Sequence, residues 1–309
     1  MSWLRSLIFV AASVLLDAAA PAAAQGGPVP AGVILVKGAW SSAAGSSSAL
    51  PEEGVVAQKQ YDNAYFGLSY SFGPDWTQRY EGPPPSDGGY YVLAQMEPQD
   101  PSRNAELGHF LIAAQDLFFT SSSADSAVQF IDYYRDHLGD EYRVERAPRK
   151  VQLANREFVR LDYLSPASGL HWHVLATEIR CHVVEFVFTG STERSLDRLV
   201  AGMNTTLRQA GSAPACVKDF ANSDALLQRE DPVFTAPRFN QVPVRIVIDR
   251  EGKVKHIHFL SAFPEQAKSV ADALSEWRFK PYLVNGQPVE VETGLMFGRA
   301  PHAGIAAQH

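Results

Sequence analysis

The sequence has little of what catalytic proteins carry. Among its 309 residues there are only two cysteines, and neither belongs to a C-x-x-C pair, which excludes thioredoxin-like redox sites and zinc ribbons. The chain also lacks a G-x-S-x-G elbow, an H-E-x-x-H motif and a glycine-rich phosphate loop. No residue can therefore be nominated as catalytic, and we expect neither an enzyme nor a cofactor.

Positive charge is also scarce. The chain has 27 Lys and Arg against 34 Asp and Glu, which gives a net charge of −7 and a pI near 5.7. A protein that holds nucleic acid through its phosphates needs a basic stripe that displaces counterions. The sequence contains no such stripe, so no nucleic-acid partner is expected.

Long hydrophobic runs are missing too. The apolar run near the amino terminus, Leu7 to Leu16, has ten residues, whereas a membrane-spanning helix needs about 20. Arg5 before the run and small residues after it have the pattern of a secretory signal peptide. We expect residues 1–24 to be cleaved, so that the mature chain begins at Gln25 in the periplasm without a transmembrane span. The alternative is an uncleaved anchor, which Asp17 disfavours.

Composition divides the rest of the chain into segments. Residues 25–58 are rich in Gly, Pro, Ser and Ala and are predicted to be a low-complexity linker or an edge strand added to the next domain. Residues 59–210 are predicted to form one α+β domain. Residues 211–228 are read as a second linker, 229–299 as a small domain and 300–309 as a mobile tail.

Hydrophobic periodicity predicts the elements of the middle domain. One helix begins at Ser123 or Asp125 and ends at Gly139, and a second begins at Ser191. The residues expected to face inward are Ala127, Val128, Ile131, Tyr134 and Leu138 on the first helix, and Leu196, Leu199, Val200, Met203 and Leu207 on the second. The expected strands are Tyr65–Tyr70, Tyr90–Gln95, His109–Phe119, Arg143–Arg146, Phe158–Tyr163, His171–Arg180 and Cys181–Thr189.

The carboxy-terminal domain begins with an alternating strand, Val242 to Asp249, whose pattern predicts that one face is buried while Arg245 faces out. The returning strand to Phe259 changes parity near Lys255, which predicts a β-bulge. An amphipathic helix follows, and its apolar stripe consists of Ala267, Val270, Ala271, Leu274 and Trp277.

Asn285-Gly286 is a strong two-residue hairpin signal, predicted to join Phe279–Val284 to Val289–Phe297. Five residues are expected to be structural, as core side chains or turn positions: Gly252, Trp277, Phe279, Pro281 and Gly286.

This ββαβ order with a divided last strand resembles the carboxy-terminal domain of TonB, the periplasmic energy transducer. The residues that carry the resemblance are Asp249…Glu251-Gly252-Lys253-Val254, Ile257-His258-Phe259-Leu260-Ser261-Ala262-Phe263-Pro264, Ala273 and Trp277-Arg278-Phe279-Lys280-Pro281.

The TonB resemblance implies that the last strand receives an extended peptide from an outer-membrane receptor, or another envelope protein, by β-augmentation. The alternative is that this edge is capped by the chain itself or paired in a homodimer. The expected partner-binding residues are Val289, Glu290, Val291, Glu292, Thr293, Leu295 and Phe297.

The middle domain is similar to PsbP-like domains, in which helices flank a sheet. The similarity rests on Asn63…Phe66-Gly67-Leu68-Ser69…Pro74-Asp75-Trp76 and on the order of elements. It implies a binding or assembly module. A second functional hypothesis is therefore a soluble periplasmic protein whose middle domain binds the partner and whose TonB-like domain docks it.

The two cysteines of an exported chain can pair. The strand after Cys181 carries the chain forward by about 26 Å and the next helix returns it by about 24 Å, so Cys181 and Cys216 can meet. The alternative is two separately buried thiols.

Two histidine pairs have the H-x-H spacing that puts both rings on one face of a strand, as a metal site requires. They are His171 with His173 and His256 with His258. Because Ile257 faces inward, the second pair is expected to point to solvent. No cysteine or carboxylate cluster accompanies that pair. His182 from the next strand could join His171 and His173, but it shares parity with Val184, Phe186 and Phe188, so we expect no metal at either place.

Overall fold

The computed structural model describes residues 40–42, 49–73, 75–80, 88–102, 105–120, 124–207, 213–222, 224–234 and 241–298. The expected signal peptide, the expected mature terminus at Gln25 and the expected tail lie outside the described residues. The described part is α+β, with more sheet than helix.

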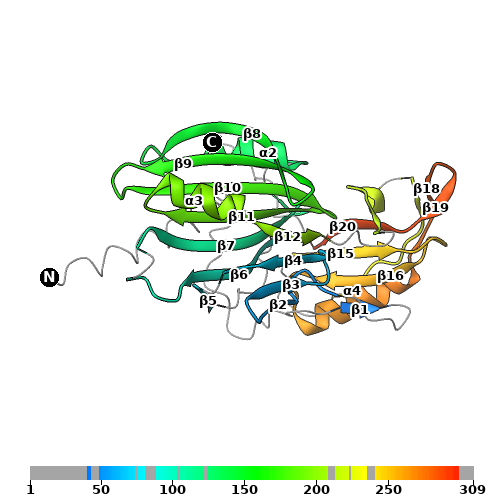
Figure 1. The fold of residues 1–309 in the computed structure, drawn as a ribbon. Helices are drawn as coiled ribbons and strands as arrows, with labels where there is room; N and C mark the ends of the chain where they lie inside the picture. The colour runs from blue at the N-terminus through cyan, green and yellow to red at the C-terminus, as the bar shows by residue number, and fades with distance from the viewer. Residues whose placement is uncertain are drawn as a thin grey trace, which may run out of the picture.

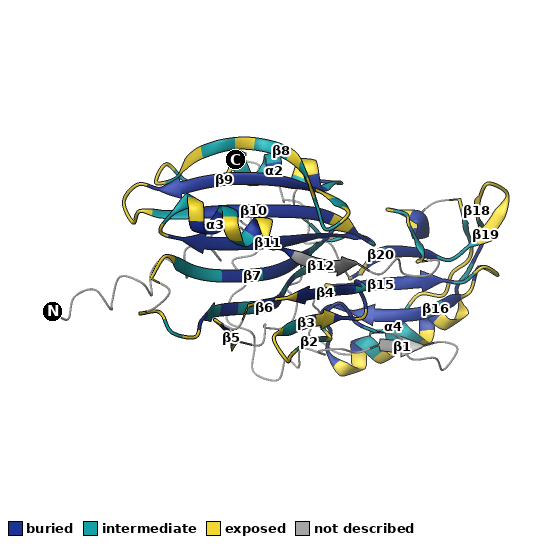
Figure 2. Ribbon diagram, in the orientation of Figure 1, coloured by how far each residue is buried: buried dark blue, intermediate teal, exposed yellow. Residues whose placement is uncertain are grey.

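The middle domain is built on a seven-stranded sheet in which all neighbouring strands are antiparallel (Figure 1). Its central strand β11 is buried along its whole length (Figure 2) because both faces of the sheet are covered. In sheet order, the strands are β5 (Trp76–Tyr80), β6 (Tyr90–Pro98), β7 (Leu107–Asp116), β11 (His182–Gly190), β10 (Leu170–Ile179), β9 (Arg156–Ser165) and β8 (Arg143–Leu153).

Helix α2 (Ala127–Asp136) covers one face of this sheet, and its Ile131 is fully buried there. Ser126 caps the helix by accepting a hydrogen bond from the backbone N–H of Gln129. The prediction that Val128 faces inward is wrong, because this side chain is 41% exposed. The apolar stripe is therefore narrower than the sequence pattern indicated.

The opposite face of the sheet carries α3 (Glu193–Ala201) and a four-stranded sheet. The helix predicted to reach Leu207 ends at Ala201 because Gly202 and the run Asn204-Thr205-Thr206 disfavour helix. Leu207 instead lies in a strand that pairs with β4. The four strands, in sheet order, are β12 (Asn204–Leu207), β4 (Leu68–Ser71), β3 (Gln60–Asn63) and β2 (Gly54–Ala57).

Two of the predicted boundaries at the start of the middle domain need correction. The strand expected from Tyr65 begins at Leu68, because residues 64–67 form a turn in which Gly67 has φ +60°. The segment 25–58 was predicted to be a linker or an edge strand added to the next domain. It contributes β2 to the edge of the four-stranded sheet, which confirms the second alternative for these residues, and β1 (Trp40–Ser42) to the carboxy-terminal sheet. It is therefore partly ordered structure.

The carboxy-terminal sheet has five strands, and helix α4 (Pro264–Glu276) packs on one face (Figure 1). The predicted bulge is confirmed, since Val247 lies opposite His256 but Ile248 lies opposite Val254, which leaves Lys255 between them. The residues of the α4 stripe join the buried core or pack against it, as predicted. In sheet order, the strands are β1, β16 (Val254–Phe259), β15 (Val242–Ile248), β20 (Val291–Phe297) and β13 (Ala215–Cys216).

The segment predicted as a linker, 211–228, belongs to this domain. Phe220 in η1 (Phe220–Asn222) is buried in the carboxy-terminal core, where its ring stacks on Phe279. Strand β14 (Leu226–Gln228) pairs with β17 (Arg278–Phe279). The linker was predicted from the run Gly211-Ser212-Ala213-Pro214-Ala215 at the start of this stretch.

The predicted long hairpin is shorter than expected. The turn at Asn285-Gly286 joins only β18 (Tyr282–Val284) to β19 (Gln287–Val289), and both turn residues have positive φ. Pro281 separates β17 from β18 because it cannot donate to a ladder. Phe279 therefore pairs with β14, while β20 pairs with β15.

Two glycines of the carboxy-terminal domain allow a matched test. Gly252 and Gly286 both have φ near +80°, but a Cβ on Gly252 would lie 1.9 Å from the carbonyl oxygen of Phe279, whereas one on Gly286 would meet nothing within 4 Å. We expect Gly286→Ala to cost about 1 kcal/mol through φ alone and Gly252→Ala about 3 kcal/mol. Urea unfolding of both variants measures the difference; equal costs would contradict the close approach of Phe279.

Candidate functional site

The second face of the carboxy-terminal sheet is buried against the middle domain. Arg245 on β15 is 1% exposed, and Glu292 on β20 and His258 on β16 are fully buried. The predictions that Arg245 faces out and that His256 and His258 point to solvent are therefore wrong. The polar residues that alternate along these strands face another domain, and Figure 2 shows β15 and β16 in the colour of buried residues.

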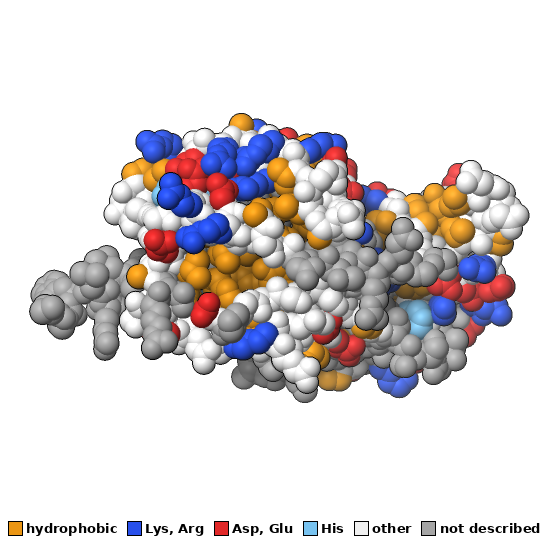
Figure 3. Space-filling view, in the orientation of Figure 1, with side chains coloured by type: hydrophobic (Ala, Val, Ile, Leu, Met, Phe, Trp, Pro, Cys, Tyr) orange, Lys and Arg blue, Asp and Glu red, His pale blue; other side chains and the backbone are white. Residues whose placement is uncertain are grey.

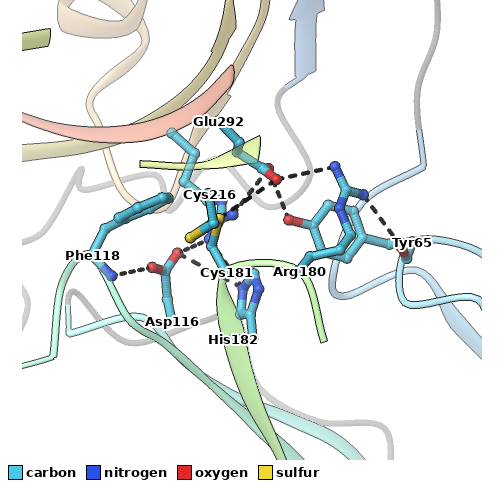
Figure 4. Close-up of a disulfide and its surroundings, with 9 residues drawn as sticks. Tyr65, Asp116, Phe118, Arg180, Cys181, His182, Cys216 and Glu292 are labelled. Atoms are coloured by element: carbon cyan, nitrogen blue, oxygen red, sulfur yellow. Dashed lines mark hydrogen bonds and ion pairs between the residues drawn. A yellow bond between two sulfur atoms is a disulfide. The ribbon is translucent and has the colours of Figure 1, made fainter. Parts of the chain in front are cut away.

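Arg245 is the centre of a buried ionic cluster between the two domains. Figure 4 labels the other charged members, Asp116, Arg180 and Glu292. Its Nη1 donates to Oδ2 of Asp116, at the end of β7, and its Nη2 lies 2.9 Å from Oε1 of Glu292. Arg180, in the turn between β10 and β11, donates from Nη2 to Oε2 of Glu292 at 3.2 Å. Tyr65 Oη donates to Oε1 of Glu292 at 2.9 Å. Two guanidinium groups thus balance two carboxylates.

Aromatic rings complete this cluster. The guanidinium carbon of Arg180 lies 3.8 Å from the centroid of the Tyr65 ring, and that of Arg245 lies 5.0 Å from the Phe118 ring. Gly294 on β20 has no side chain, which lets Phe118 approach: a Cβ there would lie 2.5 Å from the Phe118 Cβ. The interface is therefore closely packed around its charges.

The protonation states follow from burial and from the neighbouring charges. Burial alone would raise the pKa of Glu292, but Arg245 and Arg180 hold it below its ordinary value. Burial, together with Arg245 and Arg180, lowers the pKa of His182 well below its ordinary value, so the ring is neutral. Burial raises the pKa of Asp116, and Arg245 opposes that shift. Each charged group of the cluster is therefore neutralised by a neighbouring group of opposite charge.

The disulfide between Cys181 and Cys216 borders this cluster (Figure 4). Cys181 lies in the same turn as Arg180, and Cys216 lies in β13 at the edge of the carboxy-terminal sheet. Their Cα atoms are 5.4 Å apart. The bridge therefore links the middle domain covalently to the edge strand of the second sheet.

Strand β13 occupies part of the edge that the sequence predicted for a partner. It runs parallel to β20, with Ala215 opposite Val291 and Cys216 opposite Glu292. The backbone N–H of Ala215 donates to the carbonyl of Glu290 at 2.7 Å, and that of Val217 donates to Glu292 at 3.1 Å. The amino-terminal part of the predicted edge is thus paired within the chain.

The predicted partner-binding residues separate into different environments. Val289 ends β19, and Glu290, which lies between the strands, accepts a hydrogen bond from Lys255 at 2.8 Å. Glu292 belongs to the ionic cluster, and Thr293 is buried. The side chains of Val291, Leu295 and Phe297 lie in the hydrophobic core. None of these side chains forms an exposed binding surface.

Sequence reasoning missed five members of the cluster. A detectable signal was a charged residue within an otherwise apolar strand, as Arg245 is in Val242–Ile248, or at the end of one, as Asp116 is in β7. Their pairing could not be read from sequence, because the partners come from segments far apart in the chain. The missed members are Tyr65, Asp116, Arg180, His182 and Arg245.

The two histidines of the first H-x-H pair have partners within the middle domain. His171 Nδ1 lies 2.8 Å from Glu145, and His173 lies 2.7 Å from the guanidinium of Arg160. Figure 3 shows Lys and Arg side chains mixed with Asp and Glu over the region of β8 and α3, where Arg146 pairs with Glu193. Within the residues that the structure describes, no group of three or more His, Cys, Asp or Glu is arranged to hold a metal.

Glu185 is a buried carboxyl group on the α2 face of the sheet. Tyr90 Oη donates to its Oε1 at 2.9 Å, and Oε2 has no hydrogen-bond partner. Burial raises its pKa to about 7, while the bond from Tyr90 opposes this shift. The folded protein therefore holds Glu185 protonated under conditions in which the unfolded chain would ionise it.

This shift predicts a pH dependence of stability. Below about pH 4.5 the carboxyl is protonated in both states; between about 4.5 and 7 only the unfolded state ionises, so stability falls by about 3 kcal/mol as pH rises. We expect Glu185→Gln to remove this fall and to be more stable than the parent at pH 8. Urea unfolding from pH 4 to 8 tests it; parallel pH profiles would contradict it.

Comparison with known proteins identifies the carboxy-terminal domain. Residues 240–297 match the family model described as Gram-negative bacterial TonB protein C-terminal, which confirms the resemblance for this part of the chain. No curated protein matches the chain. Over the described residues, no helix has both the length and the apolar character that crossing a membrane requires.

The solved structures that are similar to this chain include the following two. The solution structure of cyanobacterial PsbP (CyanoP) from Synechocystis sp. PCC 6803 has 12% identity and a TM-score of 0.33, and the similarity covers 52% of this chain and 98% of that one. A crystal structure from Bacteroides thetaiotaomicron VPI-5482 has 14% identity and a TM-score of 0.29, and covers 48% of each chain.

Proposed function

We propose that this chain is a bacterial envelope protein whose TonB-like domain binds an extended segment of a partner protein by strand addition to the outer edge of β20. The match over residues 240–297 supports an interaction module of the TonB type. The partner would be an outer-membrane receptor or another envelope protein that presents a flexible peptide. Main-chain hydrogen bonds would supply the affinity.

The observation that carries this proposal is the direction of the main-chain groups of β20. The carbonyls of Glu290 and Glu292 accept from β13, so they point to the outer edge. Because these directions alternate along a strand, the N–H and C=O groups of Gly294 and Met296 also point outward. Among the described strands, none pairs with that edge beyond Glu292, and Met296 is 47% exposed.

Met296→Pro should abolish this binding, whereas Met296→Ala should not. Met296 lies opposite Pro243 in the ladder, so its N–H is not needed by β15, and proline there removes only an outward donor. We expect at least about tenfold weaker binding of receptor peptides, measured by fluorescence anisotropy, with unchanged circular dichroism. Equal affinity of a folded Met296→Pro variant would exclude strand addition at this edge.

A second candidate function is supported by the buried ionic cluster. Since that cluster fixes the TonB-like sheet to the middle domain, the sheet can serve to dock a middle domain that itself binds the partner. Co-purification from envelope extracts separates the two candidates. A partner captured equally by the parent chain and by Met296→Pro favours the middle domain, and concentration-dependent self-association blocked by Met296→Pro would identify a homodimer.

A further inference from the structure

We infer that the Cys181–Cys216 disulfide is a redox-controlled latch: it holds β13 on the outer edge of β20, and its reduction frees that edge. The role of the freed edge in partner binding rests on the proposed function, whereas the release of β13 on reduction does not. The first observation is the position of the disulfide. It links β13, the two-residue strand that covers the edge of β20, covalently to the middle domain.

Strand β13 has few other contacts that hold it. It pairs with β20 over only Ala215 and Cys216, and both residues keep part of their surface exposed. Pro214 before it cannot donate a backbone hydrogen bond. The next buried anchor along the chain is Phe220. A strand this short is marginal without a covalent tie, because few bonds offset the entropy of ordering it.

The two cysteines differ in their exposure to solvent. Cys216 is exposed and Cys181 is fully buried. A thiolate of a dithiol reductant therefore attacks the Cys216 sulfur, forming a mixed disulfide and releasing Cys181, which takes up a proton. The second thiolate of the reductant then attacks the mixed disulfide and releases Cys216. The reductant leaves as its disulfide, and the protein gains two thiols.

The ionic cluster is arranged to survive this reduction. Oε2 of Glu292 lies 4.0 Å from the Cys181 sulfur, within reach of a weak S–H···O hydrogen bond from the new thiol. The pairs of Arg245 with Asp116 and of Arg180 with Glu292 do not involve either cysteine. Reduction should therefore release β13 while the two domains stay docked.

Release of β13 doubles the outward main-chain positions available to a partner strand. The groups of Glu290 and Glu292, which β13 occupies, would join those of Gly294 and Met296. The oxidised protein then offers a short edge and the reduced protein a long one. A segment of extended peptide should accordingly bind the reduced form more tightly.

Hydrogen exchange tests the latch without a partner. Amide exchange of residues 213–217 would be compared in the full mature chain, oxidised and after treatment with dithiothreitol, and in the double variant C181S/C216S. We expect exchange at least about tenfold faster in this segment in both the reduced and the variant proteins, with β10 and β11 unchanged. If the exchange rates of residues 213–217 in the reduced and variant proteins stay within twofold of those in the oxidised chain, the latch is excluded. It is also excluded if exchange becomes faster throughout β10 and β11, because the disulfide would then stabilise the whole fold and not β13 alone.

A second measurement separates this inference from the proposed function. A labelled peptide of residues 213–219 carrying C216S is the probe, and its anisotropy is measured with oxidised chain and with C181S/C216S. Binding at least about tenfold tighter to the variant supports both proposals. Faster exchange with no peptide binding supports the latch and counts against strand addition. If hydrogen exchange shows that reduction does not release β13, the latch is excluded, and the Met296→Pro experiment alone decides the proposed function.

Discussion

Replacing Arg245 by leucine is expected to lower the free energy of unfolding by about 3–5 kcal/mol. The side chain is 1% exposed and bridges Asp116 and Glu292, which are themselves fully buried. Leucine fills part of the volume but leaves the buried Asp116 without its cation, while Glu292 keeps only Arg180. Urea unfolding followed by tryptophan fluorescence measures the effect.

An exposed ion pair provides the matched control. Lys268 and Asp272 are paired on α4 with side chains 76% and 65% exposed, and Lys268→Ala should cost less than about 0.5 kcal/mol. A cost for Arg245→Leu close to that of the control would show that water reaches the cluster. Simultaneous replacement of Arg245, Arg180, Asp116 and Glu292 by apolar residues should recover much of the loss, since removing a whole buried ionic group is often neutral.

The cluster explains why the two domains form one unit. An apolar contact tolerates small shifts, whereas the guanidinium of Arg245 meets both carboxylates only in one arrangement of β7, β15 and β20. Gly294 and Phe118 fit together at the same place. We expect the cluster to fix the orientation of the TonB-like sheet, and with it the direction in which the β20 edge faces.

Local patterns were sufficient for the elements whose physics is local. The α4 stripe, the bulge at Lys255 and the turn at Asn285-Gly286 depend on periodicity and on turn chemistry within a few residues, and the structure contains all three. The divided hairpin was less predictable, because β14 competes for Phe279. That competition depends on a segment whose composition resembles a linker.

The candidate site depended on contacts between distant segments. A strand that alternates apolar and polar residues looks the same whether the polar face meets water or a charged face of another domain. Arg245 and His258 were therefore expected in solvent, whereas the fold pairs Arg245 with Asp116 and His258 with Glu52. The middle-domain strands were placed correctly where the strand is mostly apolar and buried on both faces, as in β11.

Trp277→Ala should unfold the carboxy-terminal domain or cost about 3–5 kcal/mol. The indole is 2% exposed where α4 ends, contacts the rings of Phe279 and Phe297, and donates from Nε1 to the carbonyl of Glu230 at 2.7 Å. Alanine would leave a cavity in a small core and an unpaired carbonyl beside it.

Trp277→Phe separates the two contributions, because phenylalanine keeps most of the apolar volume but loses the donor to Glu230. We expect it to cost about 1–2 kcal/mol, well below the alanine variant. Hydrogen exchange of α4 and β20 would report the loss locally, while β10 and β11 should keep their protection. If Trp277→Ala left the exchange of α4 and β20 unchanged, the packing of this helix against the sheet would not be what stabilises the domain, and the edge of β20 would need another support.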